Sequence, residues 1–65
     1  MTYYVTMHNS GYMGERSYNT LRRALEVAQE WVLMGGGRSA DISRGKRGPD
    51  IYRYWYDNGM QFIHY

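Results

Sequence analysis

The feature that most restricts the fold of this chain is the dipeptide Asn58-Gly59, which separates two short runs rich in aromatic and β-branched residues. Asn-Gly favours the type I′ turn of a tight β-hairpin, because both central residues of that turn need positive φ. The flanking runs, residues 51–56 and 60–64, are therefore predicted to be antiparallel strands. With a two-residue turn, Tyr56 would face Gln61.

The predicted hairpin has two different surfaces, because side chains alternate along each strand. One face would carry Ile51, Arg53, Trp55, Met60, Phe62 and His64, and the other Tyr52, Tyr54, Tyr56, Gln61, Ile63 and Tyr65. The first face has the less polar large side chains, so we expect it in the core, with Arg53 and His64 near its rim. The opposite assignment stays open, since tyrosines can pack on a helix while their hydroxyls contact water.

One helix is predicted from Leu21 to the glycines at residues 35–37. Asn19 or Thr20 can cap its first turn, and the glycine run ends it. Apolar residues recur at helical spacing, at Leu21, Ala24, Leu25, Ala28, Trp31 and Val32.

Two further strands are predicted at residues 2–8 and 39–44, because apolar and polar side chains alternate there. Residues 9–11 have turn chemistry. Residues 12–18 are either an irregular loop or a short strand pairing with the first, and the loop is the preferred interpretation.

These elements predict a single α+β domain, residues 1–65, with one helix packed on a mainly antiparallel three- to four-stranded sheet in the order β-α-β-β-β. So short a chain buries only about 60% of the surface it would expose unfolded. With no cysteine, neither a disulfide nor a thiolate metal site stabilises it. His8 and His64 have no ligands at metal-binding spacing, so we expect no metal and no cofactor.

The N-terminal residues 1–5 have no charged region followed by a long apolar run, and no segment has the roughly 20 apolar residues that span a bilayer. We therefore expect neither secretion nor a membrane partner. The absence of cysteine fits a reducing compartment. A cytoplasmic location is predicted.

Basic and aromatic residues are concentrated in the last third of the chain. The formal net charge is only +2, but five basic and two acidic side chains lie between residues 38 and 53. Such local charge is what a polyanion or an acidic surface meets. Tyrosine adds rigid contact area with a polar tip, which suits interfaces. We therefore predict a partner-binding surface formed by Arg44, Lys46, Arg47, Tyr52, Arg53, Tyr54 and Tyr56.

Two arginines of the predicted helix, Arg22 and Arg23, belong to the same set of candidates. They lie in the first turn, where the helix dipole disfavours positive charge. Either can pair with Glu26 one turn later, which contributes only a few tenths of a kcal/mol. The functional interpretation is that both are displayed for an acidic partner, since sequences often break local rules at functional sites.

Two kinds of partner fit these residues. Single-stranded nucleic acid needs cations along its phosphates and rings that stack on its bases, at about 1–3 kcal/mol per base. A protein would use the same tyrosines and arginines as anchors without a larger positive field. A purely structural role also stays open, in which cross-strand tyrosine pairs stabilise a small sheet. No catalytic constellation is recognisable, so we expect a binding protein and not an enzyme.

The order of elements resembles that of small phage-encoded proteins, among them anti-CRISPR proteins that inhibit type I surveillance complexes. The resemblance rests on the pattern of residues 3–7, 20–31, 40–42 and 57–59. It implies a small inhibitor in the host cytoplasm that docks on a host protein or nucleoprotein complex and blocks nucleic-acid access, with no chemistry of its own. The alternative is a stand-alone nucleic-acid-binding module. A homodimer through the hairpin edge is compatible with either.

Overall fold

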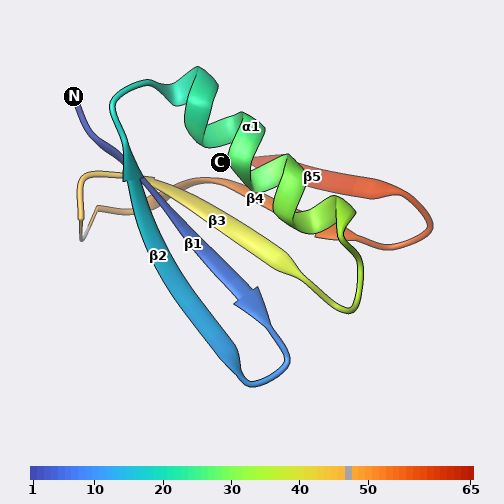
Figure 1. Ribbon diagram of the computed structural model, residues 1–65. Helices are drawn as coiled ribbons and strands as arrows, with labels where there is room; N and C mark the ends of the chain where they lie inside the picture. Colours follow the sequence, from blue (N-terminus) through green and yellow to red (C-terminus); the bar gives the residue numbers. More distant parts are fainter. Residues whose placement is uncertain (47) are drawn as a thin grey trace.

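Five strands and one helix form two layers in the computed structural model, which describes residues 1–46 and 48–65 (Figure 1). The elements are β1 (Tyr3–Asn9), β2 (Tyr12–Tyr18), α1 (Leu21–Leu33), β3 (Ser39–Arg44), β4 (Asp50–Tyr56) and β5 (Met60–His64). The strands pair antiparallel in the order β2-β1-β3-β4-β5, and α1 packs on one face. The predicted α+β class is confirmed. The predicted three to four strands in the order β-α-β-β-β are wrong, because another strand lies between β1 and α1.

The additional strand is β2, so the interpretation of residues 12–18 as a loop is wrong. β2 pairs with β1 along its whole length, from Tyr12 opposite Asn9 to Tyr18 opposite Tyr3. It is an edge strand, and most of its side chains are exposed on both faces. Such a strand needs no alternation of apolar and polar residues, and this is why its sequence does not look like a strand.

Helix α1 begins after Thr20, one of the two predicted caps. The Thr20 Oγ1 accepts a hydrogen bond from the Arg23 backbone N–H at 3.2 Å, which satisfies a free amide of the first turn. The side chains that α1 buries completely are small: Ala24, Ala28 and Val32. No helix among the described residues is long and apolar enough to span a bilayer.

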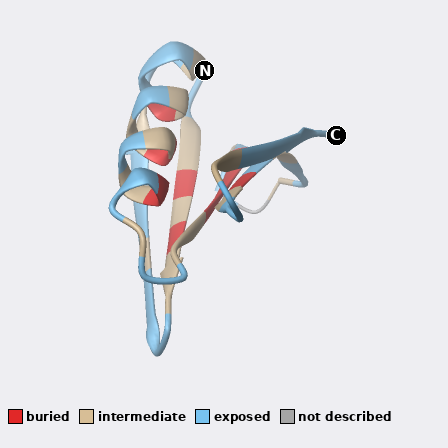
Figure 2. Cartoon of the chain, turned by 90° about the vertical axis from the view of Figure 1, so that its right-hand side faces the viewer, coloured by how far each residue is buried: buried red, intermediate tan, exposed pale blue. Residues whose placement is uncertain are grey.

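The core lies between α1 and the face of the sheet that α1 covers, which we call the helix face (Figure 2). Its buried residues are Val5, Met7, Ala24, Ala28, Val32, Ala40, Ile42 and Tyr54. Leu25 and Trp31, which helical spacing predicts in the core, pack against this cluster but are only partly buried. The centre of the core is therefore β3 under the alanines of the helix.

Trp31 fixes the end of α1 to the sheet. Its Nε1 donates to the backbone carbonyls of His8 at 3.1 Å and Ser39 at 3.0 Å, which belong to neighbouring strands. The Arg38 guanidinium lies 4.8 Å from the centre of the Trp31 ring and donates to the Gly35 carbonyl at 2.6 Å. One indole thus joins β1, β3 and the helix terminus, whose free carbonyls need such donors.

The predicted register of the β4–β5 hairpin is wrong by one residue. Tyr56 pairs with Met60, not with Gln61, and residues 57–59 form a three-residue connection. Asn58 and Gly59 both have positive φ, as the turn chemistry requires, at 54° and 115°. The extra residue in the connection turns every side chain of β5 to the other face relative to β4.

The tyrosines of β4 lie on the helix face, so the predicted burial of the Arg53 and Trp55 face is wrong and the alternative assignment holds for β4. It does not hold for β5, because Met60, Phe62 and His64 share the face of the tyrosines. Tyr54 is buried, and its hydroxyl accepts a hydrogen bond from Gln29 Nε2 at 3.2 Å. Its ring stacks on Tyr52 at 6.3 Å and on Phe62 at 5.6 Å between centroids. A tyrosine can serve here because the helix supplies a polar partner for its hydroxyl.

Ile42→Ala should lower the free energy of unfolding by about 2–5 kcal/mol, because it opens a cavity between β3 and α1. Ile42 is fully buried, whereas Leu33, at the end of α1, is 60% exposed and supplies the control. Leu33→Ala should change stability by less than about 0.5 kcal/mol. Urea denaturation followed by circular dichroism measures both changes. Equal losses would contradict the core described here.

Gly59→Val should lower the melting temperature, because a β-branched residue resists the φ of 115° at this position. Asn58→Gly is the control, since glycine adopts the φ of 54° at residue 58 without strain. Thermal denaturation should show a loss for the first variant and none for the second. A Gly59→Val protein as stable as the parent would mean that the connection has another conformation in solution.

Candidate functional site

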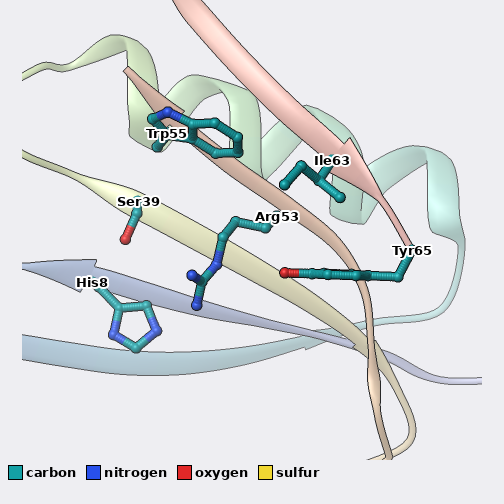
Figure 3. Close-up of a pocket in the computed structure, with 6 residues that line it drawn as sticks. All are labelled: His8, Ser39, Arg53, Trp55, Ile63 and Tyr65. Atoms are coloured by element: carbon teal, nitrogen blue, oxygen red, sulfur yellow. The ribbon is translucent and has the colours of Figure 1, made fainter. Parts of the chain in front are cut away.

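The face of the sheet opposite α1, which we call the helix-free face, contains an open cleft of about 560 Å³ (Figure 3). The cleft is lined by His8, Ser39, Arg53, Trp55, Ile63 and Tyr65. These residues come from β1, β3, β4 and β5 and from the residue that follows β5. The hairpin turns away from β1 and β2 (Figure 2), and a register shift between Ile42 and Ser43 accompanies the change. Such irregularities increase local twist and bend a sheet.

A buried carboxylate, that of Asp41, holds the polar side chains of the cleft in place. Asp41 is only 7% exposed, on the central strand β3. Its Oδ1 accepts a hydrogen bond from Arg53 Nε at 2.7 Å, and its Oδ2 accepts from Arg53 Nη2 at 3.3 Å. The Oδ2 also lies 3.1 Å from His8 Nε2. Two cross-strand neighbours thus share one carboxylate, which fixes the guanidinium plane by two parallel hydrogen bonds.

The charge distribution follows from this arrangement. The hydrogen bond to Asp41 raises the pKa of Arg53 above its already high ordinary value, so the guanidinium stays charged. Partial desolvation raises the pKa of the Asp50 carboxyl, and the Asp41 carboxylate adds to this effect, while Arg53 and His8 oppose it. Arg53 and Asp41 largely cancel each other. The cleft is therefore polar in its centre without a strong net positive field.

The rings and the guanidinium point into the same space (Figure 3). Arg53 extends into the middle of the cleft, with His8 on one side and the Tyr65 hydroxyl directed toward it from the other. Trp55 and Ile63 form the apolar part of the lining. The Arg53 side chain is half-exposed and Tyr65 is 64% exposed, so both are accessible to a partner. Tryptophan, tyrosine and arginine are the residues most enriched among binding hot spots.

Ser39 lies opposite His8 in the β1–β3 pair, yet no hydrogen bond joins their side chains in the described part of the chain. Among residues 1–46 and 48–65, no three His, Asp or Glu side chains are grouped so that they could hold a metal ion. The arrangement suits recognition by stacking, hydrogen bonding and apolar contact.

The sequence-predicted site residues are divided between the two faces. Arg53 is in the cleft, whereas Tyr52, Tyr54 and Tyr56 are on the helix face. Tyr54 is a core residue, Tyr52 stacks between Tyr54 and His64, and only Tyr56 is more than half exposed. Arg53 and the three tyrosines therefore lie on opposite faces of β4, as alternation along the strand predicts, and their role in partner binding stays a prediction.

The predicted basic residues lie at one end of the sheet. Arg44 ends β3 opposite Tyr3 and Lys46 follows in the loop, both exposed. Gly45 N–H donates to the Thr2 carbonyl at 3.1 Å, which ties this loop to the start of β1. Arg47 lies outside the described residues. Arg22 and Arg23 are exposed in the first turn of α1, at the same end of the sheet (Figure 1).

Most of the cleft was not recognised from the sequence. The missed residues are His8, Ser39, Asp41, Trp55, Ile63 and Tyr65. One feature of the sequence does indicate the cleft. In residues 39–43 the apolar Ala40 and Ile42 alternate with polar residues, which puts the Asp41 carboxylate on the helix-free face of a central strand. A buried carboxylate requires a cationic partner, and Arg53 on the next strand is the natural candidate.

Comparison of the chain with protein-family models, with curated proteins and with solved structures found no match.

Arg53→Ala should destabilise the fold, because it leaves the buried Asp41 carboxylate with His8 as its only side-chain partner among the described residues. Adding Asp41→Asn to that variant should restore part of the loss, since the amide carries no charge to desolvate. Urea denaturation of the two variants and the parent measures the effect. An Arg53→Ala protein with unchanged stability would show that the pair does not organise the cleft in solution.

Proposed function

We propose that this protein is a small binding protein without catalytic activity, which docks on a macromolecular partner through the cleft of its helix-free face. The observation that carries the proposal is the fixed Arg53 guanidinium between accessible aromatic rings. Fixing this side chain in advance lowers the entropy lost on binding, which favours recognition over a purely structural role.

A protein surface is the partner that this cleft fits best. The carboxylate of Asp41 neutralises the arginine, so the cleft has little net attraction for a chain of phosphates. Trp55, Ile63 and Tyr65 provide the apolar and amphipathic contact area that a protein interface has at its centre. Arg44 and Lys46 at the end of the sheet would then contact acidic groups at the rim.

The proposed target is a host defence nucleoprotein, specifically a type I CRISPR surveillance complex. This step rests on the resemblance of the element order to phage-encoded inhibitors and on the small size of the chain. An inhibitor of this kind would act by covering a surface that nucleic acid needs, so binding alone would be sufficient for its activity.

A stand-alone nucleic-acid-binding module is the second candidate. The observation that favours it is the gathering of exposed cations at one end of the sheet, where Arg22 and Arg23 of α1 lie with Arg44 and Lys46. Each phosphate contact on single strands would add about −0.7 to the slope of log affinity against log salt. Such binding would depend on these cations more than on Trp55.

Two neighbouring aromatic residues of β4 test which face is used. Trp55 lines the cleft, whereas Tyr56 is 51% exposed on the opposite face. The unmodified protein should prevent a purified type I surveillance complex from binding labelled target DNA in a mobility-shift assay. Trp55→Ala should weaken this inhibition by about tenfold or more, the usual effect of truncating a hot-spot aromatic. Tyr56→Ala should leave it within about twofold, as expected for a residue outside the contact.

The same proteins are titrated against a labelled single-stranded oligonucleotide without the complex, and their melting temperatures verify folding. Tight, salt-dependent oligonucleotide binding that Arg44→Ala and Lys46→Ala remove would favour the second candidate. Loss of inhibition on Tyr56→Ala, with Trp55→Ala unaffected, would contradict docking through the cleft. Absence of inhibition across a panel of type I complexes would refute the proposed target.

A further inference from the structure

Strand β5 is an open edge whose side chains are exposed on both faces. It is the last strand of the sheet, and within residues 1–46 and 48–65 only β4 pairs with it (Figure 1). Phe62, on the helix face, is 60% exposed, and Ile63, on the helix-free face, is 44% exposed. Figure 2 shows β5 exposed along most of its length. An exposed apolar edge of this kind is a template for another strand.

The register of the hairpin determines which backbone groups this edge offers. Tyr65 N–H donates to the Ile51 carbonyl at 2.9 Å, so these two residues form a hydrogen-bonded pair. Pairs alternate along an antiparallel ladder, so Ile63 and Gln61 also direct their backbone groups toward β4. Met60, Phe62 and His64 therefore direct their N–H and C=O groups away from the sheet, where an incoming strand would meet them.

We infer that two copies of this chain pair antiparallel through β5, around a two-fold axis at Phe62. In this register Phe62 meets Phe62 of the second copy, and Met60 meets His64 in each direction. All three outward residues then exchange backbone hydrogen bonds, and the phenyl rings pack side by side on the helix face. Residues 60–64 contain no Lys, Arg, Asp, Glu or Pro, so no like charges oppose the pairing.

The opposite edge explains why the pairing stops at two copies. β2 carries Glu15 and Arg16 in its centre, both exposed. On the same strand the Tyr12 ring lies against Gly14, so close that a Cβ at residue 14 would overlap the tyrosine hydroxyl. Charged side chains protect an edge from pairing, whereas β5 has no such protection. A β5-to-β5 contact uses the same surface on both copies and closes, unlike a β5-to-β2 contact, which would continue as a filament.

Charge substitutions at Phe62 test the inference by sedimentation equilibrium. The unmodified chain should be a dimer whose population rises with concentration. Phe62→Lys and Phe62→Glu should each be monomeric, because two like charges would meet at the two-fold axis. An equimolar mixture of the two variants should again form dimers, since Lys and Glu would then be neighbours. The mixture is expected to restore the dimer only if residue 62 of one copy contacts residue 62 of the other.

Met13→Lys is the matched control, because Met13 is 72% exposed on the other edge strand and should leave the dimer intact. Thermal denaturation verifies that each variant is folded. An unmodified chain that stays monomeric at millimolar concentration would overturn the inference, as would dimers that persist in Phe62→Lys alone. Loss of the dimer on Met13→Lys would also overturn it, by placing the contact at β2. None of these variants changes Trp55, the residue that tests docking. The sedimentation result is therefore independent of the proposed docking function.

Discussion

Strand β3 is buried on both faces, and the rest of the structure depends on the alternation of its side chains. Ala40 and Ile42 point to the helix and form the centre of the core, while Asp41 and Ser43 point to the helix-free face and are equally inaccessible. The apolar pair is stabilised by contact with α1. A buried carboxylate has no such source of stabilisation and must find donors. The central strand therefore requires both a helix on one side and polar partners for its carboxylate on the other.

The donors come from the two strands that flank β3. His8 of β1 and Arg53 of β4 meet at Asp41, and Arg53 is its direct cross-strand partner. The same contacts that satisfy the carboxylate hold the guanidinium in the middle of the cleft. Fold stability and site geometry thus both depend on the contacts of Asp41. Such sharing suits a short chain, which buries a small fraction of its surface. A partner would meet a side chain already ordered by the fold.

Local chemistry was sufficient to predict the elements whose signals lie within a few residues. Thr20 and the glycines after Met34 mark the ends of the helix, and Asn58-Gly59 marks the hairpin. Strand β2 and the order of the sheet were not predictable in this way, because an exposed edge strand is stabilised by backbone pairing with β1 and not by its own pattern. Of the predicted site, Arg53 lies in the cleft, while Tyr54 is in the core because Gln29 of the helix offers its hydroxyl a hydrogen bond.

The two strands of the hairpin obtain their orientation from different sources. The pairing of Asp41 with Arg53 determines which face each β4 side chain occupies, and it places the tyrosines on the helix face. The three-residue connection then determines the faces of β5, because a two-residue turn would reverse them. With that shorter turn Phe62 would enter the cleft and Ile63 would leave it. The single extra residue in the connection therefore both completes the apolar lining of the cleft and leaves a phenyl ring on the uncovered edge, where a second copy can meet it.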